Sequence, residues 1–534
     1  MPFYKILIRF KLLVVCAAFS CANLPVFSQL SDYAFVENKN SWLSSENPAG
    51  INALDTVKIT FAEIYLNKGN GEFKNYFESN NSFEYGVLTE SYYRLSAKSI
   101  VSGKILYSSF EGKNMGVSNS IDPYYNPFDI VEYADSTAGT KKKETYYLEG
   151  TLSTQLTRRL LLGLHAGYKN ISYYKIRDLR HTNDFMDLNV KAGVQYNFNR
   201  NIETGFHYAY RRSTEGISFQ SVGNKDQQFN SLINYGAFLG KQERFGESGY
   251  TSSSDNKPFF NKFHTIGFQV NLFPFRKISL YNELSASTRS GYYGKNSSTS
   301  ILYTEHEATL FHYKGIVSIK TLNSLHKLEL VFDTEDLVNR ANDFREETIE
   351  GGNTVTVYIG QNKVLNRTVS NLKFGYSGNF GIINNYPSLE LKAQVDARIS
   401  DIMAVVYPVY RMEHINKYTA TLSAGKNIFS GNNIYTVFGT AGYSFGTGYA
   451  AKDGLYNSSA SVSVFTIDRY LYREYEYLTA ARIKGEAGFR YTKVLPDRKL
   501  KLYTELVYGY TRAFDVSYLG NSYGELSARL GCRF

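Results

Sequence analysis

The chain has 534 residues, a formal net charge of +10 and a mean hydropathy of -0.32. After residue 28 it contains no apolar stretch of about 18 residues, which excludes a helical membrane protein. It also contains no run of basic residues that would suggest nucleic-acid binding. The counts that stand out are 46 Tyr, 36 Phe and 42 Gly against one Trp. This mixture suits many amphipathic strands whose tyrosines lie at membrane interfaces.

Residues 1–28 have the layout of a secretory signal peptide, with Lys5, Arg9 and Lys11 ahead of an apolar run. We place cleavage after residue 28; a lipoprotein signal ending at Cys21 is the alternative. Cleavage leaves Cys532 as the last cysteine, so neither an intrachain disulfide nor a cysteine metal site can form. We expect no metal and no cofactor.

Residues 29–54 show no alternation of apolar and polar side chains and contain Trp42. We predict a periplasmic or luminal segment that acts as a hatch, with a motif at Asn47, Pro48 and Ala49. An ordinary turn is the alternative, because Asn before Pro commonly opens a turn.

From residue 55 onward, alternating segments recur to the end of the chain, as in residues 186–198, 389–399 and 523–534. A strand places successive side chains on opposite faces, and a transmembrane strand needs about 9–11 residues. A soluble sandwich would need a second sheet against each apolar face, whereas a barrel turns all of them to lipid. In the last segment Leu530 and Phe534 lie on the apolar face, and a terminal strand ending in Phe resembles the assembly signal of bacterial outer-membrane barrels.

Short and long connections alternate along the chain, as periplasmic turns and external loops do in such barrels. The long ones are residues 112–142, 213–262, 335–366 and 449–475. We therefore predict an all-β chain in which residues 55–534 form a single transmembrane antiparallel β-barrel of about 18 strands, with 16 as the main rival. An even number places both termini in the periplasm of an outer-membrane protein.

Charged residues fall on the inward parity of three predicted strands, and they lie at Asp187, Lys191, Glu390, Lys392, Asp396, Arg398, Glu525 and Arg529. These charges either select solutes in a pore or simply pair across a polar lumen; for any single residue we favour the pairing. His165 and His207 share this parity, but their spacing does not suggest a metal site. With no nucleophile motif near the loop residues His181, His306 and His414, we expect no enzymatic activity.

Several short motifs carry a family resemblance: Glu90 to Leu95, Asp122 to Pro127, Ala134 to Ser136 and Lys143 to Tyr146. With these the chain resembles an uncharacterised outer-membrane β-barrel family of Gram-negative gut anaerobes, a domain of unknown function. That resemblance implies a role beside an uptake system. Asn47-Pro48-Ala49 is similar in type and place to the hatch motif of long-chain fatty-acid outer-membrane transporters, although those have 14 strands.

A barrel of 16 to 18 strands leaves an aqueous channel unless something fills it. We therefore predict a porin-like outer-membrane channel or uptake barrel for a small solute, passive and partly plugged by its N-terminal segment and loops. The alternative is a non-conducting accessory or scaffold barrel that docks a surface lipoprotein or a TonB-dependent receptor. The other expected partners are outer-membrane lipid and the barrel assembly machinery.

Overall fold

A computed structural model describes residues 33–56, 58–133, 135–223, 227–247, 249–252, 256–295, 301–348, 352, 354–383, 385–457, 464–495 and 500–534. The predicted signal peptide, residues 1–28, lies outside these ranges. Among the described residues, no helix is long and apolar enough to cross a membrane.

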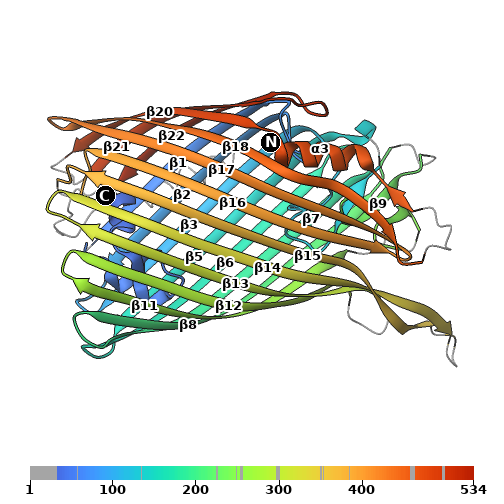
Figure 1. The fold of residues 1–534 in the computed structure, drawn as a ribbon, viewed down its shortest axis with the longest axis horizontal. Coiled ribbons are helices and arrows are strands. Elements are labelled where there is room, and N and C mark those ends of the chain that lie inside the picture. Colours follow the sequence, from blue (N-terminus) through green and yellow to red (C-terminus); the bar gives the residue numbers. More distant parts are fainter. Residues whose placement is uncertain are drawn as a thin grey trace, which may run out of the picture.

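Eighteen antiparallel strands form one sheet that closes into a barrel (Figure 1). Closure occurs where β22 (Ser522–Arg533) pairs with β1 (Lys58–Gly71), from Arg533 opposite Phe61 to Tyr523 opposite Gly71. The backbone of Phe534 extends this pairing, because its N–H and C=O both bond to Thr60, at 2.9 and 2.7 Å. The predicted barrel of 18 strands is therefore confirmed over the rival of 16, and its sheet has no free edge.

The remaining barrel strands follow the chain order. They are β2 (Asn81–Arg94), β3 (Ser99–Met115), β5 (Gly139–Gln155), β6 (Leu160–Lys175), β7 (Arg180–Asn197), β8 (Ile202–Gln220), β11 (Lys257–Phe275), β12 (Ile278–Gly294), β13 (Leu302–Lys320), β14 (Ser324–Thr348), β15 (Thr354–Phe380), β16 (Leu389–Val406), β17 (Val409–Ser430), β18 (Asn433–Leu455), β20 (Arg482–Leu495) and β21 (Leu500–Ala513).

The two ends of the barrel differ in how the strands are joined. At the end where β22 finishes, which we call the turn end, all connections are short; the opposite end, the loop end, carries the longer ones (Figure 1). One predicted long loop is wrong: within residues 335–366, β14 continues to Thr348 and β15 resumes at Thr354. These two strands stay paired as a hairpin that projects beyond the rim, where both faces can be polar because neither meets lipid.

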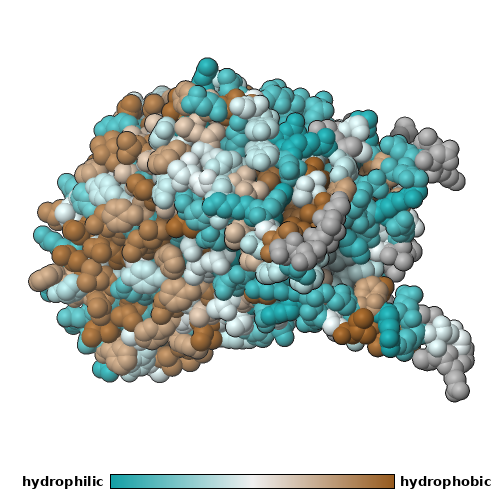
Figure 2. Space-filling model, turned by 45° about the vertical axis from the view of Figure 1, so that its right-hand side comes forward, coloured by the Kyte–Doolittle hydropathy of each residue, from teal (hydrophilic) through white to brown (hydrophobic). Residues whose placement is uncertain are grey.

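The outer wall is apolar around the whole circumference, and Figure 2 shows its hydrophobic surface gathered towards the turn end. Each barrel strand carries an exposed large apolar or aromatic side chain, for example Ile64, Tyr85, Ile105, Leu148, Leu164, Val190, Phe206, Phe268, Leu284, Phe311, Leu330, Phe374, Val395, Leu422, Val437, Phe489, Leu506 and Leu530. A continuous apolar belt on a closed sheet is the surface of a barrel that spans a membrane.

Loops from the loop end fold inward and fill the mouth of the barrel. They supply a second sheet of four short strands, β4 (Asp129–Glu132), β9 (Asn230–Gly236), β10 (Leu239–Arg244) and β19 (Phe465–Thr466), together with helix α3 (Asp468–Thr479) and the turn η3 (Asp135–Thr137). We call this assembly, together with the loop residues 116–128 that lead into β4, the loop plug. Its apolar residues are buried in two clusters, centred on Phe128 and Ile233 and on Phe238 and Leu471.

At the turn end, residues 33–56 lie inside the barrel as three short helical turns: α2 (Tyr33–Asn38), η1 (Ser41–Ser44) and η2 (Pro48–Ala53). We call them the N-terminal segment. The lumen therefore holds two inserts, one at each end.

Candidate functional site

The N-terminal segment docks on the wall through Asn47. The side-chain Nδ2 of Asn47 donates to the carbonyls of Val194 (2.9 Å) and Phe206 (3.2 Å) and to Oε1 of Gln269 (3.0 Å). Its Oδ1 accepts from the N–H of Ala49 at 3.0 Å, which caps η2, and Pro48 fills the first helical position, where a missing N–H costs nothing. Asn47 and Ala49 are fully buried.

A notch of glycines in the wall makes room for this contact. A Cβ added at Gly163 would lie 2.1 Å from the amide nitrogen of Ala49, and one at Gly193 would lie 2.1 Å from Oδ1 of Asn47. At Gly205 the nearest atom would be Nδ2 of Asn47, at 2.7 Å. Gly163 on β6 and Gly193 on β7 are directly opposite in the sheet, and Gly205 lies on the next strand, β8. Three neighbouring strands therefore have no side chain at the place where Asn47 and Ala49 dock.

Trp42, ahead of Asn47, is held from two sides. Its indole Nε1 donates to Glu203 at 2.6 Å, and its ring meets Tyr281 edge to face at 5.5 Å. Glu283 then accepts from the backbone N–H of Glu46 at 3.1 Å. These contacts fasten a segment with little regular structure of its own.

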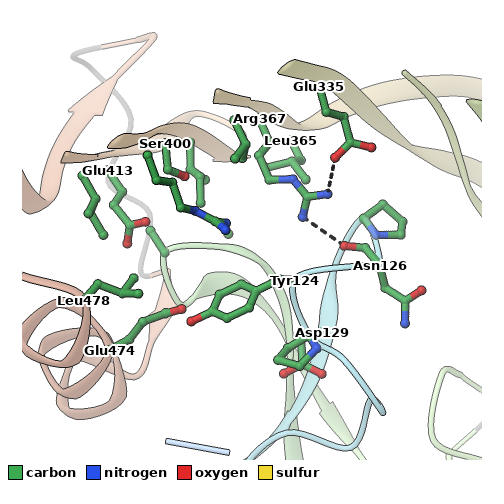
Figure 3. Close-up of a pocket in the computed structure, with 18 of the residues that line it drawn as sticks. Tyr124, Asn126, Asp129, Glu335, Leu365, Arg367, Ser400, Glu413, Glu474 and Leu478 are labelled. Carbon is green, nitrogen blue, oxygen red and sulfur yellow. Dashed lines mark hydrogen bonds and ion pairs between the residues drawn. The ribbon is translucent and has the colours of Figure 1, made fainter. Parts of the chain in front are cut away.

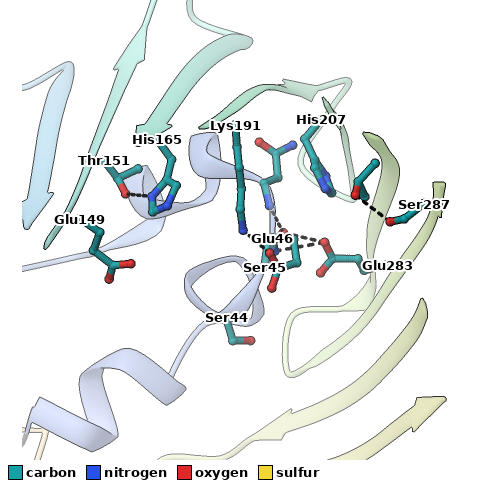
Figure 4. A network of polar contacts seen from close by, with 12 residues as sticks. Ser44, Ser45, Glu46, Glu149, Thr151, His165, Lys191, His207, Glu283 and Ser287 are labelled. Atoms are coloured by element: carbon teal, nitrogen blue, oxygen red, sulfur yellow. Dashed lines mark hydrogen bonds and ion pairs between the residues drawn. The ribbon is translucent and has the colours of Figure 1, made fainter. Parts of the chain in front are cut away.

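Lys191, one of the predicted luminal charges, pairs with Glu46 of the N-terminal segment between the two predicted histidines (Figure 4). His165 bonds to Thr151 at 2.9 Å and His207 bonds to Gln269 at 2.7 Å. In the part of the chain that the structure describes, no group of three or more His, Cys, Asp or Glu side chains could hold a metal ion.

Two arginines of the barrel wall, Arg289 on β12 and Arg367 on β15, anchor the loop plug. Glu335 on β14 pairs with Arg289 at 2.9 Å and with Arg367 at 3.4 Å. The same two guanidinium groups donate to the carbonyls of Tyr125 and Asn126 in the plug, at 2.8 and 3.1 Å. Figure 3 shows Arg367 reaching from the wall to Asn126.

Two adjoining cavities lie between the plug and the wall among the described residues. The first chamber, of about 580 Å³, lies against β14–β17, and the second, of about 660 Å³, lies against β17, β18 and β20–β22. Both are lined by Phe77, Glu78, Lys417 and Tyr477, so they adjoin. Volumes of this size are typical of sites for small solutes.

The structure places the other predicted luminal charges as follows. Arg211 donates to Asp187 through Nε, which lies 3.0 and 2.9 Å from the two carboxylate oxygens, and through Nη2. Asp396 accepts from Gln394 at 2.9 and 2.7 Å. Arg529 lies 3.5 Å from Glu505. Glu390 and Lys392 lie outside both chambers, on the turn-end half of β16.

Two predicted charges line the chambers: Arg398 the first and Glu525 the second. Charged residues that were not predicted also line the first chamber, among them Glu413, Lys417 and Glu474. Glu413 and Lys417 follow the same parity rule on β17 and could have been found by it. Glu474 lies on α3, whose path into the lumen no sequence pattern indicates.

Among the acids of the plug, Asp129 and Glu474 have pKa values that burial raises to about 7. Burial raises the pKa of Asp129 to about 7, against the hydrogen bonds donated by Ser120 and Ser118. Its Oδ2 has no partner among the described residues. Burial likewise raises the pKa of Glu474 to about 7, while its hydrogen bond with Tyr124 acts in the opposite direction. A carboxyl that is neutral near pH 7 can donate a hydrogen bond into the lumen.

Sequence comparison shows what this barrel is related to. Residues 48–534 match a family of unknown function, and that match covers all the barrel strands. The chain belongs to the family of unknown function DUF6850. For this DUF6850 chain, no protein with a curated description matches.

The DUF6850 chain is similar in structure to several solved barrels. The ferric preacinetobactin receptor BauA from Acinetobacter baumannii is 10% identical, with a TM-score of 0.39 over 89% of this chain and 79% of that one. The outer membrane transporter YddB from Escherichia coli is 7% identical, with a TM-score of 0.41 over 89% and 81%.

The toluene transporter TodX from Pseudomonas putida is 8% identical, with a TM-score of 0.28 over 91% and 92%. Scores below 0.5 add nothing to the barrel form that the strand pairing already establishes. The expected similarity to the long-chain fatty-acid transporters is not shown. This barrel has 18 strands, whereas those transporters have 14.

Proposed function

We propose that this chain is a passive outer-membrane channel for a small solute, partly plugged by its two luminal inserts. One observation carries the proposal: an 18-strand barrel with an apolar outer belt keeps two polar chambers inside its lumen, between the loop plug and the wall. A filled lumen built only for stability would bury apolar side chains there, whereas the chamber walls carry charges such as Arg398, Lys417 and Glu525.

In this proposal the turn end faces the periplasm and residues 33–56 act as the hatch. The Asn47 contact with the glycine notch fixes the hatch at one position, and polar or ionic contacts around Trp42 and Glu46 hold the rest. Polar contacts in a wet lumen are individually weak, so such a segment can leave without unfolding the barrel.

The barrel assembly machinery would insert this chain through its last strand, with Leu530 facing lipid and Phe534 at the seam. No energy-coupling motif is recognisable near the N-terminus, so transport would follow the concentration gradient of the solute. We propose no catalytic role for the luminal histidines, since no nucleophile motif accompanies them in the sequence.

Osmotic swelling of liposomes tests the proposal. Liposomes that contain the purified, folded barrel are diluted into isotonic solutions of neutral solutes of increasing size. We expect swelling with small solutes and none with large ones, and faster swelling after removal of residues 33–56. A folded barrel that never permits swelling, with or without that segment, would refute the channel.

The hairpin of β14 and β15 favours a second candidate, a scaffold that docks a surface lipoprotein or a TonB-dependent receptor. It projects beyond the rim and exposes Ile359 by 63% and Tyr358 by 44%. Crosslinking in native outer membrane should then recover one stoichiometric partner through this hairpin, and recovery of the barrel alone would count against it.

A further inference from the structure

We infer that the first chamber binds a small amphoteric solute, one that carries both an ammonium and a carboxylate, such as a short peptide. This inference rests on the proposed channel function and names its solute class. It follows from two charged poles in the chamber, Arg398 with Lys417 and Glu413 with Glu474, none of which forms an ion pair within the described residues.

The cationic pole is built on neighbouring strands of the wall. Arg398 on β16 lies directly opposite Lys417 on β17, and both line the chamber. Like charges directly opposite each other destabilise a sheet. Within the described ranges neither side chain forms an ion pair, and both remain accessible from the chamber. Such a pair is stabilised when an anionic group binds between the two cations.

The acidic pole lies one step further along the same cavity. Glu413, on the inward face of β17, and Glu474, on α3, are only 5% and 8% exposed. Oε2 of Glu413 has no hydrogen-bond partner in the described part of the chain, and neither carboxyl forms an ion pair there. Figure 3 shows Glu413 and Glu474 directed into the space beside Tyr124.

The two acids together suit a single positive charge. Carboxyls that are buried close to each other cannot both ionise, so one proton is retained; burial raises the pKa of Glu474 to about 7. An ammonium group carries three donors and would replace that proton while satisfying the unpartnered Oε2. A pair with one net negative charge therefore matches one ammonium.

Tyr124 of the loop plug sets the separation of the poles. The Arg398 guanidinium lies over its ring, 5.9 Å from the centroid, while its hydroxyl bonds to Glu474 and accepts from Asn75 at 2.7 Å. The cationic pole thus lies over the face of this ring and the acidic pole at its hydroxyl end. A solute that spans them needs its two charges separated by about that length, as in a short peptide.

Binding of triglycine and of its two capped forms tests this inference. Isothermal titration calorimetry on the purified full-length barrel would compare triglycine, N-acetyl-triglycine, which lacks the ammonium, and triglycine amide, which lacks the carboxylate. We expect each capped form to bind at least about tenfold more weakly, because each loses a charge-assisted contact.

The variants assign the poles. In Glu413→Gln, N-acetyl-triglycine should no longer bind more weakly than triglycine, and in Arg398→Gln the same should hold for triglycine amide. Lys392→Gln is the matched control: it removes a cation from the same face of β16 outside the chamber and should leave all three affinities unchanged. Heat-modifiable migration in gels verifies that each variant folds.

Equal affinity for triglycine and either capped form, or no triglycine binding, would overturn the inference. So would a Lys392→Gln effect as large as that of Arg398→Gln. The channel proposal fails separately, because it is judged by swelling without peptide. If the barrel permits swelling but does not bind triglycine, the channel proposal stands and the proposed solute class is wrong. If it binds triglycine with the expected pattern but never permits swelling, the binding site stands and the channel proposal is wrong.

Discussion

Gly193→Ala should release the N-terminal segment from the wall while leaving the barrel intact. The new Cβ would lie 2.1 Å from Oδ1 of Asn47 and 2.9 Å from Cδ of Pro48. Gly193 is hydrogen-bonded within a sheet to β6 and β8, so the wall cannot move aside and the inserted segment must.

The magnitude follows from the contacts that would be lost. Asn47 makes three hydrogen bonds to the wall, at 2.9, 3.2 and 3.0 Å. The amide has two hydrogens to share among these acceptors, so at about 1 kcal/mol per donor their loss would weaken docking by roughly 2 kcal/mol, or about thirtyfold in the ratio of docked to undocked molecules. The cap on η2 would be lost as well.

Trp42 provides the assay, since it is the one tryptophan of the chain and is only 1% exposed. Undocking should shift its fluorescence to the red and increase quenching by acrylamide. Gly442→Ala is the matched control: this glycine also lines the lumen, but its added Cβ would be 3.6 Å from the nearest atom. Unchanged emission in Gly193→Ala, or equal shifts in both variants, would refute the docking argument.

Three further predictions follow from the plug and the wall. Burial raises the pKa of Asp129 from 3.8 to about 7, so plug docking is strongest below pH 4 and weakens as the pH rises to about 7. Hydrogen exchange of residues 116–133 should show this pH dependence, and Asp129→Asn should abolish it. Glu335→Gln removes the shared partner of two wall arginines and should loosen the plug by about 3 kcal/mol, seen as faster exchange of residues 122–128, whereas unaltered exchange would contradict that anchoring role. Leu530→Asp puts a charge on the lipid face and should lower the free energy of unfolding by up to about 2 kcal/mol in urea titrations. Glu525→Gln should not, because Glu525 faces the second chamber. Equal damage from both would mean that the faces of β22 are wrongly assigned.

The barrel was predictable because alternation of side chains and connection length are both local in sequence. Strands such as residues 186–197 show their two faces directly, and the short turns between them fix the order. The projecting hairpin of β14 and β15 was mistaken for a loop because it lies beyond the lipid, where nothing requires an apolar face.

The inside of the barrel was much less predictable. Parity indicated Arg398 but not its opposition to Lys417, which depends on the register between strands. The glycine notch joins three strands to Asn47 across more than a hundred residues of chain, and Glu474 enters the lumen on a helix within a loop. Such contacts depend on how inserts pack in three dimensions, which local patterns do not encode.

Single-channel conductance in planar bilayers tests the central claim most directly. The mature chain is compared with a variant that lacks residues 33–56, both purified in the folded state. We predict small or no conductance for the mature chain and a clearly larger, stable conductance for the variant. If the two conduct equally, or if neither conducts, residues 33–56 do not gate a channel in this barrel.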